Sequence, residues 1–185
     1  MLSVSRIAVI PLIVVLASLQ IPICDTLACA LFAAAAITDY FDGKLARNWG
    51  QTSELGRMLD PIADKLLVAA CLMVLVAANS MSAAGLFPAI VIMLREILIS
   101  GLREYLASAR VGLPVTLLAK WKTGFQMGAI GLLLLGPAGA ATIGLSWFPN
   151  LIIGEGMLWM AASLTLVTGW NYLRVGIHHA TSVAT

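Results

Sequence analysis

The chain has 185 residues, of which 61% are hydrophobic and 11% carry a charged side chain, and its formal net charge is +2. A soluble domain typically carries about 25% charged residues. The composition therefore excludes an ordinary soluble protein and indicates an integral membrane protein. We expect membrane lipids, and no nucleic acid, among its partners.

Six apolar segments can each be placed as a membrane-spanning helix, which needs roughly 20 residues. We expect these spans at about residues 6–24, 27–45, 60–79, 85–107, 123–146 and 150–175. They leave almost no chain for a separate soluble domain, so residues 1–185 are predicted to form a single all-α membrane domain. Pro11 and Pro22 are expected inside the first span. The third span is expected to begin at Asp60-Pro61, because proline suits a first helical turn.

The basic residues predict the orientation of these spans. None of the eleven Lys and Arg residues falls in the connecting segments 20–26, 80–85 or 147–150. Basic residues in short loops are retained on the cytoplasmic side of a membrane. We therefore expect six transmembrane helices with both termini in the cytoplasm, and we expect the polar stretch between the second and third spans on the same side.

Four aspartates follow a helical spacing around that polar stretch. Asp39 and Asp42 are three residues apart, and Asp60 and Asp64 are four apart, so each pair shares one helix face. If the two helices are antiparallel neighbours, the four carboxylates converge, and their mutual repulsion requires a cation among them. Oxygen ligands alone favour Mg²⁺, and Mn²⁺ can substitute.

Small residues and an arginine accompany these acids. Gly43 and Gly56 lack side chains and Ala46 is nearly bare, so a flat group can approach the helix backbones closely. Arg47 can bind a phosphate oxygen in a bidentate manner. With a divalent cation, these features indicate a nucleotide diphosphate. The alternative is that the acids only form ion pairs with the neighbouring basic residues, Lys44, Arg47, Arg57 and Lys65.

The full pattern is Asp39-xx-Asp42-Gly43-xx-Ala46-Arg47, then eight residues, then Gly56-xxx-Asp60-xxx-Asp64. At every fixed position it resembles the signature of the CDP-alcohol phosphotransferases. The resemblance implies a six-helix membrane domain, a site for two Mg²⁺ ions, a CDP-linked donor and a homodimer.

The resemblance also implies a role for each position of the motif. Asp39, Asp42 and Asp60 correspond to metal ligands. Asp64 corresponds to the last ligand and to the catalytic base that deprotonates the attacking hydroxyl. The motif positions that would bind the CDP donor are Gly43, Ala46, Arg47 and Gly56. Ser53, which lies between the two halves of the motif, would contact a phosphate or the ribose of the donor.

Charged residues also interrupt the fourth apolar segment. Arg95 and Arg103 are eight residues apart, slightly more than two helical turns, so they lie roughly on one helix face. Together with Lys120 and Lys122, which follow in a predicted loop, they form a basic cluster that suits a phosphorylated acceptor. The alternative is that these side chains extend to anionic lipid headgroups or pair with acids of the same helix, Glu96 and Glu104.

The stretch LREILISGLREYLASARVGLPVTLLAKWKTGFQM resembles the acceptor half of the bacterial family members that join CDP-diacylglycerol to sn-glycerol 3-phosphate. On this resemblance Arg95, Arg103 and Lys120 hold the glycerol phosphate, and the site faces the cytoplasm from the bacterial inner membrane. Ala119 departs from the glycine expected before Lys120. The alternatives are an inositol phosphate or serine acceptor, or an ion-coupled transporter that uses the acids as a relay.

Overall fold

A computed structural model describes residues 2–49, 54–109 and 117–183 of the chain. It describes their side chains except those of residues 2–5, 39–49, 54–58, 60–61, 108, 175 and 178–183. Within the described residues every regular element is helical, which confirms the predicted all-α class. The elements are α1 (Leu2–Ser18), α2 (Pro22–Trp49), α3 (Glu54–Ala77), the 3-10 helix η1 (Ala83–Gly85), α4 (Leu86–Ser108), α5 (Leu117–Thr142) and α6 (Asn150–Val183).

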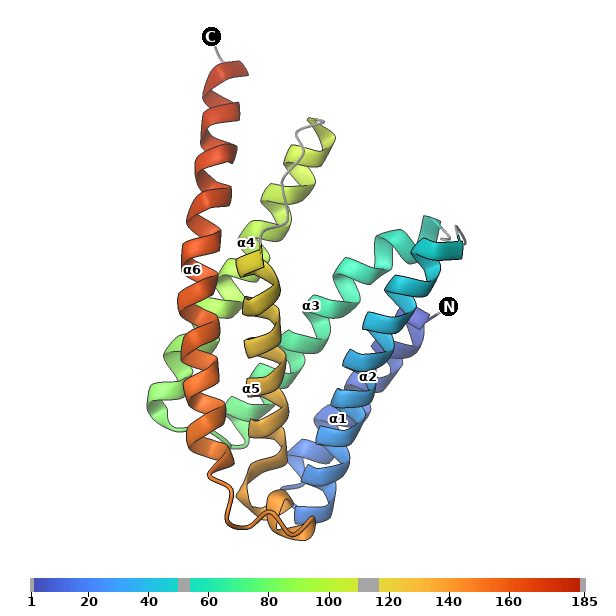
Figure 1. The fold of residues 1–185 in the computed structure, drawn as a ribbon, viewed down its shortest axis with the longest axis vertical. Helices are drawn as coiled ribbons and strands as arrows, with labels where there is room; N and C mark the ends of the chain where they lie inside the picture. Colours follow the sequence, from blue (N-terminus) through green and yellow to red (C-terminus); the bar gives the residue numbers. More distant parts are fainter. Residues whose placement is uncertain (1, 50–53, 110–116, 184–185) are drawn as a thin grey trace.

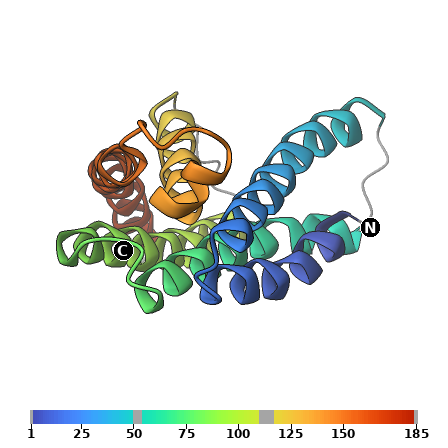
Figure 2. The ribbon, with the colours of Figure 1, turned by 90° about the horizontal axis from the view of Figure 1, so that it is seen from below.

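The six α-helices run alternately up and down, so α1 begins and α6 ends towards the same end of the molecule (Figure 1). Helix α1 packs against α2 and α3, α5 packs against α2 and α6, and α4 packs against α6. Seen from below, α5 lies between α2 on one side and α6 on the other (Figure 2). Helices α3 and α4 diverge towards the upper end of Figure 1. The larger of the two cavities described below lies between these helices.

Three helical segments among the described residues are long and apolar enough to cross a membrane: Ala83–Ala107, Leu117–Thr142 and Asn150–Arg174. Large apolar side chains, such as those of Met73 and Ile152, are widely exposed on the surface. Monomeric soluble proteins rarely expose extensive apolar surface, whereas lipid accommodates it. The predicted membrane protein is therefore confirmed, while the number of six spans stays a prediction.

Two prolines lie at helix positions that differ from those predicted. Pro22, expected inside the first span, begins α2 after a turn in which Gln20 has a φ of 53°. A first helical turn does not need the missing N–H group, so proline is well placed there. Pro61, expected in a first turn, lies inside α3 because that helix already begins at Glu54. Membrane helices tolerate such interior prolines.

Helix α5 also begins earlier than predicted, at Leu117 instead of about residue 123. Lys120 and Lys122 therefore lie on a helix and not in a loop. Near its other end the helix is broken at Gly136, which has φ 57° and ψ 171° and precedes Pro137. Glycine adopts a positive φ without steric cost, and proline cannot donate the helical hydrogen bond, so these two residues together account for the kink.

The core is apolar and receives buried side chains from all six α-helices. Its fully buried side chains include Phe32 of α2, Leu67 of α3 and Leu133 of α5. Gly154 lets α6 approach this core, because a Cβ atom at Gly154 would lie 3.0 Å from Cγ of Leu133. A Cβ atom at Gly156, two residues further along α6, would meet nothing within 4 Å apart from its chain neighbours and the nearby backbone of its own helix.

This contrast predicts unequal effects of the same substitution. Gly154→Val should destabilise the protein by about 1–3 kcal/mol, since it forces extra carbons into a packed core. Gly156→Val should leave stability almost unchanged, and it controls for placing a β-branched residue in α6. The midpoint of thermal unfolding in detergent measures both. Equal midpoints for the two variants would contradict the close packing of Gly154 on Leu133.

Candidate active site

The aspartate motif lies on two consecutive helices. Asp39 and Asp42 lie on α2, and Asp60 and Asp64 lie on α3. Because the backbone is helical through both pairs, the spacings of three and four residues place each pair on one helix face. The side chains of Asp39, Asp42 and Asp60 lie outside the described part of the chain. Their convergence with Asp64 stays a prediction.

The positions predicted to bind the CDP donor belong to the same stretch. Gly43, Ala46 and Arg47 lie on α2, and Gly56 lies on α3. What surrounds these four positions is outside the described part, and Ser53 falls outside the described residues altogether. Their roles therefore stay predictions as well.

Asp64 lines a small cavity of about 20 Å³. The same cavity is lined by Lys65 of α3, Glu96 of α4, and Lys122 and Gln126 of α5. Such a volume is close to that needed by one water-sized group. Three helices therefore bring carboxylate, ammonium and amide groups together beside the aspartate that the sequence predicts to be the catalytic base.

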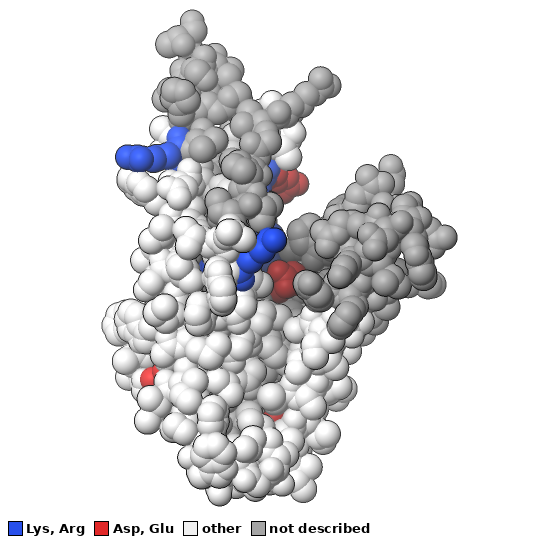
Figure 3. All heavy atoms as spheres, in the orientation of Figure 1, with Lys and Arg blue, Asp and Glu red and all other residues white. Residues whose placement is uncertain are grey.

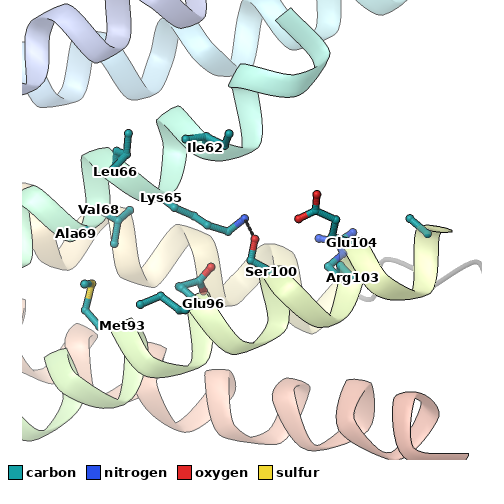
Figure 4. A pocket seen from close by; sticks show the side chains of 12 residues that line it. Ile62, Lys65, Leu66, Val68, Ala69, Met93, Glu96, Ser100, Arg103 and Glu104 are labelled. Carbon is teal, nitrogen blue, oxygen red and sulfur yellow. Dashed lines mark hydrogen bonds between the residues drawn. The ribbon is translucent and has the colours of Figure 1, made fainter. Parts of the chain in front are cut away.

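A larger cavity of about 800 Å³ opens between α3 and α4 (Figure 4). Part of its wall is apolar, formed by side chains such as Leu66 and Ile97, and part is polar. The polar lining residues are Lys65, Glu96, Ser100, Arg103 and Glu104. Lys65 donates a hydrogen bond from Nζ to Oγ of Ser100 at 2.6 Å, which bridges α3 and α4. Lys65 and Glu96 line both cavities, so the two spaces are neighbours.

A network of largely buried charges borders these cavities, because Glu96 lines both of them and Lys122 lines the smaller one. Lys122 donates from Nζ to Oε1 of Glu96, and NH1 of Arg95 contacts the same oxygen at 3.3 Å. The side chains of Lys122, Glu96 and Arg95 are only 8%, 19% and 11% exposed. Buried charges are tolerated when they are paired. Two cations therefore contact one carboxylate oxygen in this network.

Arg95 and Arg103 both reach Tyr172 of α6. Their guanidinium carbons lie 5.8 and 5.9 Å from the centre of the Tyr172 ring, within the range of cation–π attraction. Arg95 also donates from NH2 to Oγ1 of Thr168 at 2.9 Å. Gly169 permits this approach, because a Cβ atom there would lie 3.2 Å from Cγ of Arg95. The shared face predicted for Arg95 and Arg103 is thus confirmed.

The two lysines at the start of α5 have different surroundings. Lys122 is buried, whereas Lys120 is exposed and lines neither of the two cavities described above. Residues two apart on a helix do not face the same direction. The structure therefore brings Arg95 and Arg103 together, and brings Lys122 close to them through Glu96, but it leaves Lys120 apart from this group.

Sequence reasoning assigned no role in the site to Lys65, Ser100, Gln126 or Tyr172, and it included Lys122 only as a member of the basic cluster. A signal existed for one pair, because Lys122 and Gln126 are four residues apart and share a helix face. The predicted start of the fifth span near residue 123 left Lys122 outside the helix, so the shared helix face of Lys122 and Gln126 was not recognised. The contact of Tyr172 with two arginines depends on how α4 packs against α6, which no local pattern in the sequence reveals.

Comparisons with known proteins give the same family that the aspartate motif resembles. The profile of the CDP-alcohol phosphatidyltransferase family matches residues 1–167. Three similar proteins carry the name CDP-diacylglycerol–glycerol-3-phosphate 3-phosphatidyltransferase. The relative from Rickettsia bellii is 42% identical over 94% of this chain and 91% of its own. The relative from Cereibacter sphaeroides is 39% identical over 83% and 82%, and that from Salmonella choleraesuis 38% over 94% and 91%.

The family profile and these relatives span most of the chain, and the profile includes both the aspartate motif and the helices that form the two cavities. The chain therefore belongs to the CDP-alcohol phosphatidyltransferase family.

Proposed function

We propose that this protein transfers the phosphatidyl group of CDP-diacylglycerol to sn-glycerol 3-phosphate, releasing CMP and forming phosphatidylglycerophosphate in phospholipid biosynthesis. The observation that carries the proposal is the shared name of relatives that resemble the chain over most of its length. The site adds a chemical reason, because an acceptor with its own phosphate needs cations beyond those that hold the donor. Arg103 and Lys65 supply such cations in the larger cavity next to Asp64.

For the donor half, we infer that Asp39, Asp42, Asp60 and Asp64 hold two Mg²⁺ ions, with Mn²⁺ as a substitute. A donor set made only of carboxylates fits such hard cations. When bound, the ions would neutralise negative charge that develops on the pyrophosphate during transfer. The residues that would bind the CDP group are Gly43, Ala46, Arg47, Ser53 and Gly56.

For the acceptor half, Asp64 takes the proton of the attacking hydroxyl as a general base. The hydroxyl oxygen forms a bond to the phosphorus that carries the lipid, and the bond from that phosphorus to CMP breaks. Arg103 binds the acceptor phosphate from the wall of the larger cavity, and Arg95 adds positive charge from the network behind it. Lys120 is the third phosphate contact that the resemblance implies, but it is exposed on α5 and lines neither described cavity, so the proposed phosphate site rests on Arg103 and Arg95.

We also propose six transmembrane helices, cytoplasmic termini and a cytoplasmic active site in a bacterial inner membrane, with a homodimer as the working assembly. The distribution of charge supports this orientation. On the face drawn in Figure 3, the basic side chains gather in the upper half, while the lower half is almost uncoloured. Basic residues concentrate on the cytoplasmic side of membrane proteins.

Release of CMP by the purified protein tests the proposed reaction. With CDP-diacylglycerol and Mg²⁺, glycerol 3-phosphate should be the preferred acceptor over inositol phosphate, free glycerol and serine. Preference for serine or glycerol would overturn the assignment of a phosphorylated acceptor. Preference for inositol phosphate would retain the phosphate site and change the product.

Two aspartate variants separate metal binding from proton transfer. Asp60→Asn should lose metal binding and turnover together. Asp64→Asn should keep more donor binding while turnover collapses by about a hundredfold or more, because loss of a base acts mainly on the transition state. Donor affinity and single-turnover rates measure the two effects. Near-normal turnover in Asp64→Asn would show that Asp64 is not the base.

Arg103→Ala tests the acceptor phosphate site. The substitution removes a charge-assisted contact worth about 1.5–3 kcal/mol, so kcat/KM for glycerol 3-phosphate should fall roughly ten- to a hundredfold. The KM for CDP-diacylglycerol should change little. Arg174→Ala is the matched control, because Arg174 is an exposed arginine that lines neither described cavity. Equal losses in both variants would indicate a general effect of surface charge and not a phosphate contact.

A further inference from the structure

The buried amide of Gln126 is the feature that the proposed reaction leaves unexplained. Gln126 is 3% exposed, and its Oε1 atom is buried without a hydrogen-bond partner among the described residues. Buried polar side chains in proteins are nearly always hydrogen-bonded. Gln126 also lines the small cavity that contains Asp64. The unpaired amide oxygen therefore lies in the same cavity as the proposed base, where a substrate group can reach it.

The size and position of the small cavity restrict what can meet Gln126. Its volume of about 20 Å³ is close to that needed by one water-sized group, so it suits a hydroxyl better than a phosphate or a sugar ring. It adjoins the larger cavity through Lys65 and Glu96, which line both. A small molecule with its phosphate near Arg103 in the larger cavity can therefore place only a slender hydroxylated end beside Asp64 and Gln126.

The chemistry of the amide suits a hydroxyl group. A glutamine side chain offers an acceptor oxygen and donor N–H groups, and a hydroxyl can both donate and accept. Glycerol 3-phosphate carries two hydroxyls on adjacent carbons. If Asp64 takes the proton of the attacking one, the neighbouring hydroxyl can meet another polar group of the same cavity, and Gln126 offers an acceptor oxygen that has no hydrogen-bond partner among the described residues.

We propose that Gln126 binds the non-reacting hydroxyl on the middle carbon of the acceptor and so selects a phosphorylated polyol over a simple phosphorylated alcohol. This inference rests on the proposed function. Gln126 acts as a specificity-determining residue, because an acceptor without that hydroxyl leaves the buried amide oxygen unpaired. Sites that hydrogen-bond a substrate hydroxyl discriminate strongly against analogues that lack it.

The test compares glycerol 3-phosphate with 3-hydroxypropyl phosphate, which lacks only the middle hydroxyl. The full-length protein in detergent is assayed for CMP release with CDP-diacylglycerol and Mg²⁺. The wild type should prefer glycerol 3-phosphate by about ten- to a hundredfold in kcat/KM. In Gln126→Met, which keeps length but loses hydrogen bonding, the two values should come within about threefold of each other through loss of activity with glycerol 3-phosphate.

Gln126→Glu provides a second variant if the methionine variant does not fold. Its carboxylate retains a hydrogen-bond acceptor in a cavity whose two acids, Asp64 and Glu96, are matched by Lys65 and Lys122, so most of the preference between the two acceptors should remain even if both rates fall. Thr165→Val is the matched control. Oγ1 of Thr165 is likewise buried and unpaired among the described residues, but Thr165 lines neither described cavity. This variant should keep the wild-type preference.

Three results would overturn the proposal. They are a wild type that does not distinguish the two acceptors, a Gln126→Met variant that slows both equally, and a Gln126→Glu variant that loses the preference entirely. An equal slowing would assign Gln126 a structural role or a role in holding a water beside Asp64. Failure of the proposed function differs from all three, because the wild type would then release no CMP with glycerol 3-phosphate.

Discussion

The pairing of buried charges is the constraint on which the described part of the site depends. Removal of one partner from a buried ion pair typically costs about 3–5 kcal/mol, because the other charge is left uncompensated. Glu96 of α4 must therefore keep its contacts with Lys122 of α5 and with Arg95. Arg95 in turn donates to Thr168 of α6. Apolar packing can hold helices together in several rotations, whereas this network is satisfied only when the three helices have one register.

The two ends of the helix bundle are held together differently. At the end opposite the site, Gln20 donates to the carbonyl of Ala78, and the hydroxyl of Ser82 donates to Glu155 at 2.8 Å. The first contact ties the turn after α1 to the turn after α3, and the second ties the segment before η1 to α6. At the other end α3 and α4 diverge (Figure 1), and the hydrogen bond of Lys65 crosses between them. The larger cavity thus lies where α3 and α4 are bridged by polar side chains instead of packing directly against each other.

Composition and periodicity were sufficient to predict the helices, but they could not locate all of the helix ends. In a membrane protein, proline is compatible with a first turn and with a helix interior. The presence of Pro22 and Pro61 therefore did not show whether each begins a helix or lies inside one. The start of α5 was misplaced because a polar segment with two lysines reads as a loop when the contacts of those lysines are unknown. With the helix begun at Leu117, Lys122 and Gln126 face the interior together.

The candidate site was predictable to different extents in its two halves. The aspartate motif identifies a family because its residues follow one another at fixed local spacings on α2 and α3. The spacing of Arg95 and Arg103 likewise predicted a shared helix face, since both lie on α4. The contacts of these arginines with Tyr172, and the position of Lys122 against Glu96, join segments that are far apart in the sequence. They depend on helix packing, and local patterns carry no information about it.

Helix α3 connects the two halves of the site through consecutive residues. Asp64 lines the small cavity, and Lys65 lines both cavities and reaches Ser100 across the opening to α4. Neighbouring helical residues are turned by about 100° from each other. One short piece of α3 therefore fixes the position of the proposed base, Asp64, relative to Lys65, a cation of the larger cavity. Arg103, by contrast, is held by α4. The distance between base and acceptor phosphate therefore depends on the spacing of α3 and α4, and an anion between Lys65 and Arg103 would attract both helices at once.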